Sequence, residues 1–280
     1  MAEPAEDRTG KPPETALGDV QDRIRRWWDE DARTYDRTPS HAATDPMEAA
    51  AWRAALARHL PPAPARVLDA GAGTGAMSLL AAELGYRVTA LDLSAEMLEH
   101  ARRKAGERGL EVEFVVGPAS EPPSGPFDAV VERHVLWTTL DPVGTLRAWR
   151  GVVPPGGRLV LFEGIWMPTD RAARLRHRVG RRVGRLLGEG HDHHSEYDRG
   201  MLSSLPLASQ TSAGPMLRAV EEAGWAGIRL ERLGDVEWTR QLGGGVSQRI
   251  AGPSPQFAVV AVAPDQDPVT DLTAPAGGAR

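Results

Sequence analysis

One short segment constrains the fold of this chain more than any other, because three glycines follow an apolar run within nine residues. The segment is VLDAGAGTG at residues 67–75, and a helix-forming stretch follows it. Glycines in this setting allow a tight turn, with the backbone close to a nucleotide and a helix amino terminus facing it. The segment therefore predicts a strand, a nucleotide-binding turn and a helix, the first unit of an open α/β sheet.

The rest of the chain alternates short β-branched runs with helical periods. Such alternation is typical of a parallel sheet covered by helices on both faces. We predict an α/β fold with a Rossmann-like, seven-stranded, mostly parallel sheet, and we expect Ser94 to cap one helix. The expected helices are residues 75–84, 95–108, 142–152 and 213–223, and the expected strands are residues 66–70, 87–91, 112–116, 129–132, 158–163, 227–232 and 256–262.

Two helical additions interrupt this regular pattern. Residues 22–35 and 46–60 precede the sheet, and residues 169–187 lead into a polar loop that ends near residue 210. An insertion at the carboxyl ends of the strands overhangs the ligand site of an open α/β sheet, so the second addition is expected to form a lid. The expected organisation is a disordered tail (1–18), one domain (19–263) with a helical cap (19–60) and a lid insertion (165–210), and a second disordered tail (264–280).

The charge and cysteine content exclude several kinds of partner. The 280 residues carry a net charge of -5 and no cysteine. The chain therefore has no disulfide and no thiolate metal site, and it lacks the basic surface that a nucleic-acid backbone requires. The first residues do not resemble a secretory signal, and no stretch reaches the roughly 18 apolar residues of a membrane span. We expect a cytoplasmic protein with no nucleic-acid or membrane partner, and a homodimer stays open.

Two carboxylates indicate which nucleotide the glycine turn binds. Asp69 stands at the end of the first strand, where it would repel a pyrophosphate but suit the ammonium group of a methionine moiety. Asp92 ends the next strand, about 20 residues on, where a carboxylate can accept the hydroxyls of a ribose. The pair favours a cofactor with a positive charge near the turn over a dinucleotide.

Four stretches of the sequence carry a family resemblance: VLDAGAGTG, VTALDLSAEML, FDAVVERHVLWTTLDP and PPGGRLVLFE. Over residues 27–262 the chain resembles the class I S-adenosylmethionine-dependent methyltransferases, in particular the methyltransferase-11/UbiE-like group of actinobacterial natural-product pathways. The resemblance implies S-adenosylmethionine as cofactor and S-adenosylhomocysteine as product. It implies that Asp92 and Leu93 hold the ribose and that Met97 packs near the adenine. The methionine part would lie against Asp69, Ala70, Gly71, Gly73 and Gly75.

Two further stretches complete the expected cofactor site. Such proteins often have an acid after the third strand that binds the adenine amino group, but this chain has Gly-Pro-Ala-Ser there. Backbone groups near Ala119 and Ser120 are therefore expected to contact the adenine. Glu132 and Arg133 end the fourth strand and face the reactive end of the cofactor, because ligands bind at the carboxyl edge of such a sheet.

His134 is the candidate general base, because an imidazole titrates near neutrality and the residue follows the fourth strand. The alternative is a histidine that only orders the loop. Tyr35 lies in a segment that resembles the Tyr-Asp segment with which the family covers its cofactor, so we expect it to contact the methionine part. Trp27 and Trp28 precede it at helical spacing, and a packing stripe is the favoured interpretation for them.

The acceptor is expected to contact two tryptophans and a polar loop. The loop contains three histidines, but their irregular spacing argues against a structural metal. A polar lid that touches the acceptor is the favoured interpretation. The candidate acceptor residues are Trp137, Trp166, His191, His193, His194 and Tyr197.

The sequence thus predicts methyl transfer from S-adenosylmethionine to a nitrogen, oxygen or nucleophilic carbon of a small natural product, in secondary metabolism such as antibiotic biosynthesis. Two alternatives stay open: a catalytically silent S-adenosylmethionine-binding regulator or scaffold, and an NAD-dependent oxidoreductase. Asp69 and the lack of a separate substrate domain disfavour the second. Residues 171–187 place Leu175, Val179, Val183 and Leu186 on one helical face with arginines around them. The acidic chain favours a solvated helix there over a membrane-surface or RNA-binding one.

Overall fold

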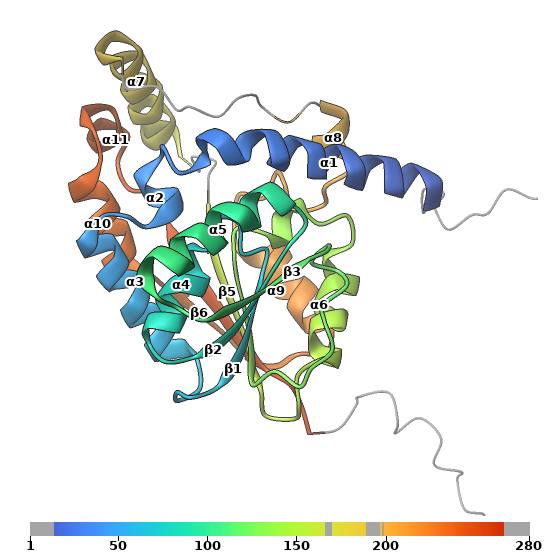
Figure 1. The fold of residues 1–280 in the computed structure, drawn as a ribbon. Helices are drawn as coiled ribbons and strands as arrows, with labels where there is room; N and C mark the ends of the chain where they lie inside the picture. Colours follow the sequence, from blue (N-terminus) through green and yellow to red (C-terminus); the bar gives the residue numbers. More distant parts are fainter. Residues whose placement is uncertain (1–13, 166–169, 189–196, 198, 266–280) are drawn as a thin grey trace, which may run out of the picture.

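The computed structural model describes residues 14–165, 170–188, 197 and 199–265. Seven strands form one sheet in the order β3-β2-β1-β4-β5-β7-β6 (Figure 1). The pairings among the first five strands are parallel, and β7 runs antiparallel to both β5 and β6. The predicted seven-stranded, mostly parallel sheet is confirmed. Its strands are β1 (Arg66–Ala70), β2 (Arg87–Asp92), β3 (Val112–Val116), β4 (Ala129–Arg133), β5 (Arg158–Gly164), β6 (Ala226–Arg232) and β7 (Gln256–Val262).

Helices cover both faces of the sheet, and α1 runs across its upper end above α5 (Figure 1). One face packs against α3, α4, α5 and α10, and the other packs against α6 and α9. The α-helices are α1 (Glu14–Tyr35), α2 (Pro39–Ala42), α3 (Pro46–His59), α4 (Ala76–Glu83), α5 (Ala95–Arg108), α6 (Pro142–Gly151), α7 (Arg171–Leu187), α8 (Arg199–Ser203), α9 (Gly214–Glu222), α10 (Gly234–Gly243) and α11 (Val246–Ala251), and a 3₁₀ turn, η1, covers Leu136–Thr138.

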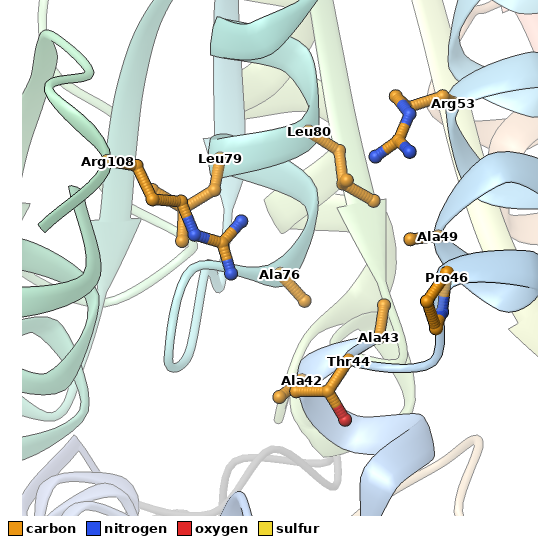
Figure 2. Close-up of a pocket in the computed structure, with 10 residues that line it drawn as sticks. All are labelled: Ala42, Ala43, Thr44, Pro46, Ala49, Arg53, Ala76, Leu79, Leu80 and Arg108. Atoms are coloured by element: carbon orange, nitrogen blue, oxygen red, sulfur yellow. The ribbon is translucent and has the colours of Figure 1, made fainter.

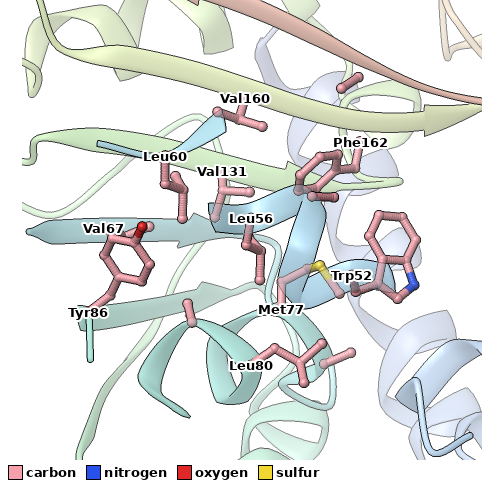
Figure 3. Packing of buried hydrophobic residues seen from close by; sticks show 14 of the residues in the cluster. Trp52, Leu56, Leu60, Val67, Met77, Leu80, Tyr86, Val131, Val160 and Phe162 are labelled. Carbon is pink, nitrogen blue, oxygen red and sulfur yellow. The ribbon is translucent and has the colours of Figure 1, made fainter. Parts of the chain in front are cut away.

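One of the two main core clusters joins α3 to the sheet. Trp52 and Leu56 of α3 and Met77 of α4 pack against strand residues (Figure 3). The rings of Trp52 and Phe162 lie 5.3 Å apart in an edge-to-face arrangement. Trp52 and Leu56 are fully buried, so α3 is part of the core that fixes the carboxyl ends of β4 and β5.

Most boundaries agree with the sequence prediction, but some elements were missed. The predicted spans of β1, β3, β7 and α5 are confirmed, and the other strands and sheet-covering helices shift by one or two residues. The helix expected to begin at residue 22 begins at Glu14, inside the predicted tail, because Val20 and Ile24 continue its packed face. The sequence analysis did not predict α10 or α11, which lie between β6 and β7 in a glycine-rich segment of low helix propensity. It also missed the short helices α2 and α8.

Candidate active site

The turn after β1 has the conformation for which glycine is required. Gly71 and Gly73 have φ values of 75° and 55°, in the left-handed region that side chains rarely adopt. A side chain at Gly71 would overlap Val135 in the loop after β4, whereas the space beside Gly73 is open. The first glycine therefore allows close packing of two loops, and the second leaves room beside the backbone.

Asp92 joins the two turns that follow β1 and β2. Its Oδ2 accepts the N–H of Gly73 at 2.7 Å, and its Oδ1 accepts the N–H of Ser94 at 2.8 Å. Burial raises the pKa of Asp92 to about 6, although these two hydrogen bonds oppose the shift. Ser94 caps α5 as predicted, because its Oγ accepts the N–H of Met97 at 3.1 Å. A ribose bound here would compete with Gly73 for the Asp92 carboxylate.

Asp69 is buried at the end of β1, and its Oδ2 accepts the hydroxyl of Ser78 at 2.5 Å. Burial raises the pKa of Asp69 to about 6, against the hydrogen bond from Ser78 and the charge of Arg133. Five of the predicted site residues line one small cavity of about 20 Å³. They are Tyr35, Asp69, Gly71, Gly73 and Arg133.

A cavity of about 20 Å³ holds little more than one water molecule. Ligand pockets usually measure roughly 300 to 1,000 Å³, so a nucleoside cofactor fits this site only if neighbouring elements move. The donor set itself suits such a cofactor: a glycine turn at the start of α4 and carboxylates at the ends of β1 and β2. The chemistry of the site therefore fits S-adenosylmethionine.

The α1–α2 segment closes this cavity. The rings of Tyr35 and His41 stack with centroids 4.2 Å apart, and both residues line the cavity. Arg133 donates to the backbone carbonyls of Ser40 and His41. Tyr35 therefore lies beside Asp69 and the glycine turn, and Arg133 connects β4 to the α1–α2 segment.

Asp29 of α1 and Asp36, which follows α1, fix this segment to α5 and to the turn after β1. Asp36 accepts the hydroxyl of Thr74 at 2.6 Å and pairs with Lys104 at 2.9 Å. Asp29 accepts the hydroxyl of Ser94 at 2.7 Å. Sequence reasoning missed these partners, which lie 38 to 68 positions apart. Only Asp36 could have been recognised from the sequence, because it follows Tyr35 and completes the Tyr-Asp pair of the resembling family.

His134 lies between the ends of β4 and β5. Its φ of 64° is unusual for a residue other than glycine. Its Nδ1 lies 3.3 Å from Oε2 of Glu163, which the sequence analysis did not single out. Burial lowers the pKa of His134 well below its ordinary value, and the charge of Arg133 adds to this effect. The ring is therefore neutral near pH 7, the form that can accept a proton.

Two buried carboxyl groups, Glu132 and Glu163, lie beside this histidine. Oε2 of Glu132 accepts the N–H of Val135 at 2.8 Å and so holds the loop after β4. Oε1 of each glutamate is buried without a hydrogen-bond partner in the described part of the chain. Burial raises the pKa of Glu132 to about 8 and raises the pKa of Glu163 well above its ordinary range, where the neighbouring Glu132 adds to the shift. The two groups therefore retain protons near neutral pH.

The acceptor candidates that the structure describes belong to an aromatic cluster. The ring of Tyr197 lies 5.7 Å from Trp137 and 4.6 Å from Trp27. Trp28 lies 4.7 Å from Trp27 and 6.0 Å from Tyr35. Trp27 and Trp28 thus pack as predicted, but against acceptor candidates. The other candidates, Trp166, His191, His193 and His194, lie outside the described residues.

The adenine side of the site has fewer available groups than expected. The carbonyl oxygen of Ala119 accepts the indole N–H of Trp149 at 2.6 Å, and Ser120 is exposed. The side chain of Ala70 is fully buried in the core, so only its backbone adjoins the turn. Met97 is buried, and Leu93 packs toward the aromatic cluster.

A larger cavity of about 250 Å³ lies beside the first turn of α4 (Figure 2). Ala76 lines both this cavity and the smaller one. The wall of the larger cavity is mostly apolar, with Arg53 and Arg108 at its edge. Each guanidinium lies 3.1 Å from a carboxylate oxygen of Glu83. None of the predicted site residues lines this larger cavity.

The glycine turn, the two strand-end carboxylates and the strand order define the class I S-adenosylmethionine-dependent methyltransferases. In the described part of the chain, no group of three or more His, Asp or Glu side chains is placed to hold a metal ion. None of the described helices is long and apolar enough to cross a membrane.

Comparisons with known proteins agree with this class. The family model described as "Methyltransferase domain" matches residues 68–161. The ubiquinone biosynthesis O-methyltransferase of Xanthomonas axonopodis pv. citri (strain 306) is 34% identical over 176 residues, which are 61% of this chain and 69% of that protein. This chain belongs to the S-adenosylmethionine-dependent methyltransferase family, and S-adenosylmethionine is its methyl donor.

Two solved structures share the fold. A chain in the complex between the Haloferax volcanii Trm112 methyltransferase activator and a methyltransferase is 20% identical, with a TM-score of 0.55, over 88% of this chain and 98% of that one. The [4+2]-cyclase SpnF is 19% identical, with a TM-score of 0.51, over 76% of this chain and 80% of that one. At these identities the likeness concerns the fold alone.

Proposed function

We propose that this methyltransferase methylates an oxygen atom of a small aromatic natural product. The observation that carries the proposal is the buried pair of His134 and Glu163 at the ends of β4 and β5. A hydroxyl acceptor must lose a proton, and a neutral imidazole at the carboxyl edge of the sheet can take it. The relative from Xanthomonas is named an O-methyltransferase, which supports oxygen over nitrogen or carbon.

The bound cofactor supplies an electrophilic methyl group on a sulfonium. Asp92 would hold the ribose hydroxyls of S-adenosylmethionine, and Asp69 would face its methionine ammonium. In this proposal the carbonyl oxygen of the protonated Glu163 carboxyl accepts the Nδ1–H of His134, and Nε2 would take the proton of the acceptor hydroxyl. The acceptor oxygen forms a bond to the methyl carbon as the carbon–sulfur bond breaks. Alignment provides a large part of the acceleration in such a displacement.

The aromatic cluster supports a planar acceptor. Trp137 and Tyr197 approach to 5.7 Å, and aromatic rings in this range offer faces and edges to a further ring. Burial raises the pKa of Tyr197, so its hydroxyl stays protonated. The acceptor would lie between this cluster and His134.

The test is transfer of a ¹³C-labelled methyl group from S-adenosylmethionine to hydroxylated aromatics, with matched aromatic amines and activated carbon acceptors in parallel. A methyl resonance of an aryl ether in the product is the expected result. Transfer only to nitrogen or carbon would contradict the oxygen assignment. Tight binding of S-adenosylhomocysteine without turnover on any acceptor would favour the catalytically silent alternative.

A further inference from the structure

Helix α7 packs on the body of the protein through glycines. Gly180 and Gly184 are its buried residues, and α7 lies along α11. A side chain at Gly180 would come within 2.6 Å of the carbonyl oxygen of Ser247 and 3.1 Å of Cβ of Ala251. The small residues of α7 therefore form its contact face.

Three large apolar residues of α7 lie on a different face. Leu175, Val179 and Leu186 are 59%, 43% and 80% exposed. At 3.6 residues per turn, this apolar stripe lies about 140° around the helix axis from the two buried glycines. The sequence predicts a single amphipathic face here, and the structure leaves that face in solvent.

The charge on this part of the molecule is opposite to that of the whole chain. Helix α7 contains seven arginines and no acidic residue, and α11 adds Arg249 and no acidic residue. The complete chain carries a net charge of -5. The two helices stand together at one corner of the molecule, apart from the sheet (Figure 1). The seven arginines are Arg171, Arg174, Arg176, Arg178, Arg181, Arg182 and Arg185.

We propose that the exposed face of α7 binds the surface of an anionic lipid bilayer. The stripe of Leu175, Val179 and Leu186 would enter the boundary between headgroups and acyl chains, while the flanking arginines bind lipid phosphates. An amphipathic helix with a strongly basic polar face has the composition of an interfacial helix. Such a helix lies on the bilayer and does not span it, in agreement with its 17 residues and seven arginines.

Two other occupants fit these observations less well. An RNA backbone would pair with the arginines but would leave a leucine that is 80% exposed without a partner. A second copy of the chain would bring two helices of seven arginines each together without any acidic residue on either helix. The inference concerns where the enzyme acts and does not depend on which atom it methylates.

The test is sedimentation of the full-length protein with vesicles of phosphatidylcholine alone or mixed with phosphatidylglycerol, at low and high salt. Binding is expected with the anionic vesicles at low salt, and at least about tenfold weaker binding is expected with neutral vesicles or at high salt. Equal binding to both vesicles, or binding to neither, would overturn the proposal.

Two triple variants separate the apolar and the charged contributions. Leu175→Ser with Val179→Ser and Leu186→Ser removes the stripe, and Arg174→Gln with Arg178→Gln and Arg185→Gln removes three charges. The charge variant is expected to lose roughly 100-fold in vesicle affinity, since each arginine near the surface contributes about fivefold.

The matched control removes three exposed arginines elsewhere, by Arg87→Gln, Arg102→Gln and Arg103→Gln. It should keep the vesicle affinity of the parent protein. All three variants should keep their melting temperature and their affinity for S-adenosylhomocysteine, because the substituted side chains are exposed and lie outside the cofactor site. Equal losses in the control and α7 variants would overturn the proposal, as would α7-dependent binding of an RNA fragment or α7-dependent dimerisation in place of vesicle binding.

Discussion

Asp92 at the end of β2 and Glu163 at the end of β5 are carboxylates on the same edge of one sheet, but their surroundings differ. Both oxygens of Asp92 accept backbone N–H groups. In Glu163 one oxygen faces His134, and the other is buried with no hydrogen-bond partner among the described residues. Burial raises the pKa of Asp92 to about 6, and burial together with the neighbouring Glu132 raises that of Glu163 well above its ordinary range.

This difference indicates that cofactor binding and proton transfer occur at different parts of the carboxyl edge of the sheet. The β1–β2 side uses a contiguous turn and backbone groups, which suit the binding of polar hydroxyls. The β4–β5 side keeps a neutral imidazole and protonated carboxyl groups out of water, an arrangement suited to proton transfer. Substitutions on one side should therefore affect cofactor binding, and substitutions on the other should affect the rate of methyl transfer.

The largest effect is expected at His134. His134→Ala should lower kcat roughly 100-fold or more and leave the affinity for S-adenosylhomocysteine nearly intact, because a proton acceptor is lost. Raising the pH should partly restore the rate, since the acceptor then ionises without a base. His134→Asn is the matched variant, because asparagine tolerates the positive φ better than alanine. Parallel losses of affinity and rate in both variants, without rescue by pH, would assign His134 to the loop alone.

The next effect lies on the binding side, at Asp92. Asp92→Ala should weaken S-adenosylhomocysteine binding by about 1 to 3 kcal/mol, because buried donors lose their acceptor. Titration calorimetry measures this change, and kcat at saturating cofactor should change little. The variant Asp92→Asn retains one acceptor oxygen and should lose less. Unchanged affinity in the alanine variant would remove Asp92 from the site, and binding of NAD would contradict the cofactor assignment.

A smaller effect is expected at Glu163, which positions the proposed base His134. Glu163→Leu should lower kcat about tenfold, because Nδ1 of His134 loses its hydrogen-bond acceptor and the ring loses its orientation. Glu163→Gln should restore most of the rate, since its amide oxygen can accept the same N–H. The pH profile of kcat distinguishes this role from a structural one. Equal rates in both variants, or an equal loss of cofactor affinity, would refute the positioning role.

The two sides of the edge also differ in how far the sequence predicts them. Asp69, the glycine turn and Asp92 lie within 24 positions and carry a local pattern, so the sequence predicts both their elements and their meeting place. Glu163 contacts a histidine 29 positions away, and Asp36 contacts Lys104 across 68 positions. These contacts depend on how β5 and α1 pack, which single-residue patterns do not encode. For α7 the helical period predicts the apolar face and a solvated helix, but it does not indicate which partner binds that face.

The last prediction concerns the protonated carboxyl of Glu132 and the stability of the fold. Burial raises the pKa of Glu132 from about 4.5 to about 8, so between these values the folded chain keeps a proton that the unfolded chain releases. The free energy of unfolding then falls as pH rises, by up to about 1.4 kcal/mol per pH unit for one proton.

Glu132→Gln removes this titration, and its amide oxygen can still accept the N–H of Val135. Urea denaturation between about pH 5.5 and about pH 7.5 should therefore show a shallower loss of stability in the variant than in the parent protein. Glu111→Gln, at an exposed position, is the control and should follow the parent curve. Parallel curves for Glu132→Gln and the parent would mean that Glu132 ionises near its ordinary pKa in the folded chain, and the proposed contrast between the two sides of the edge would then rest on Glu163 alone.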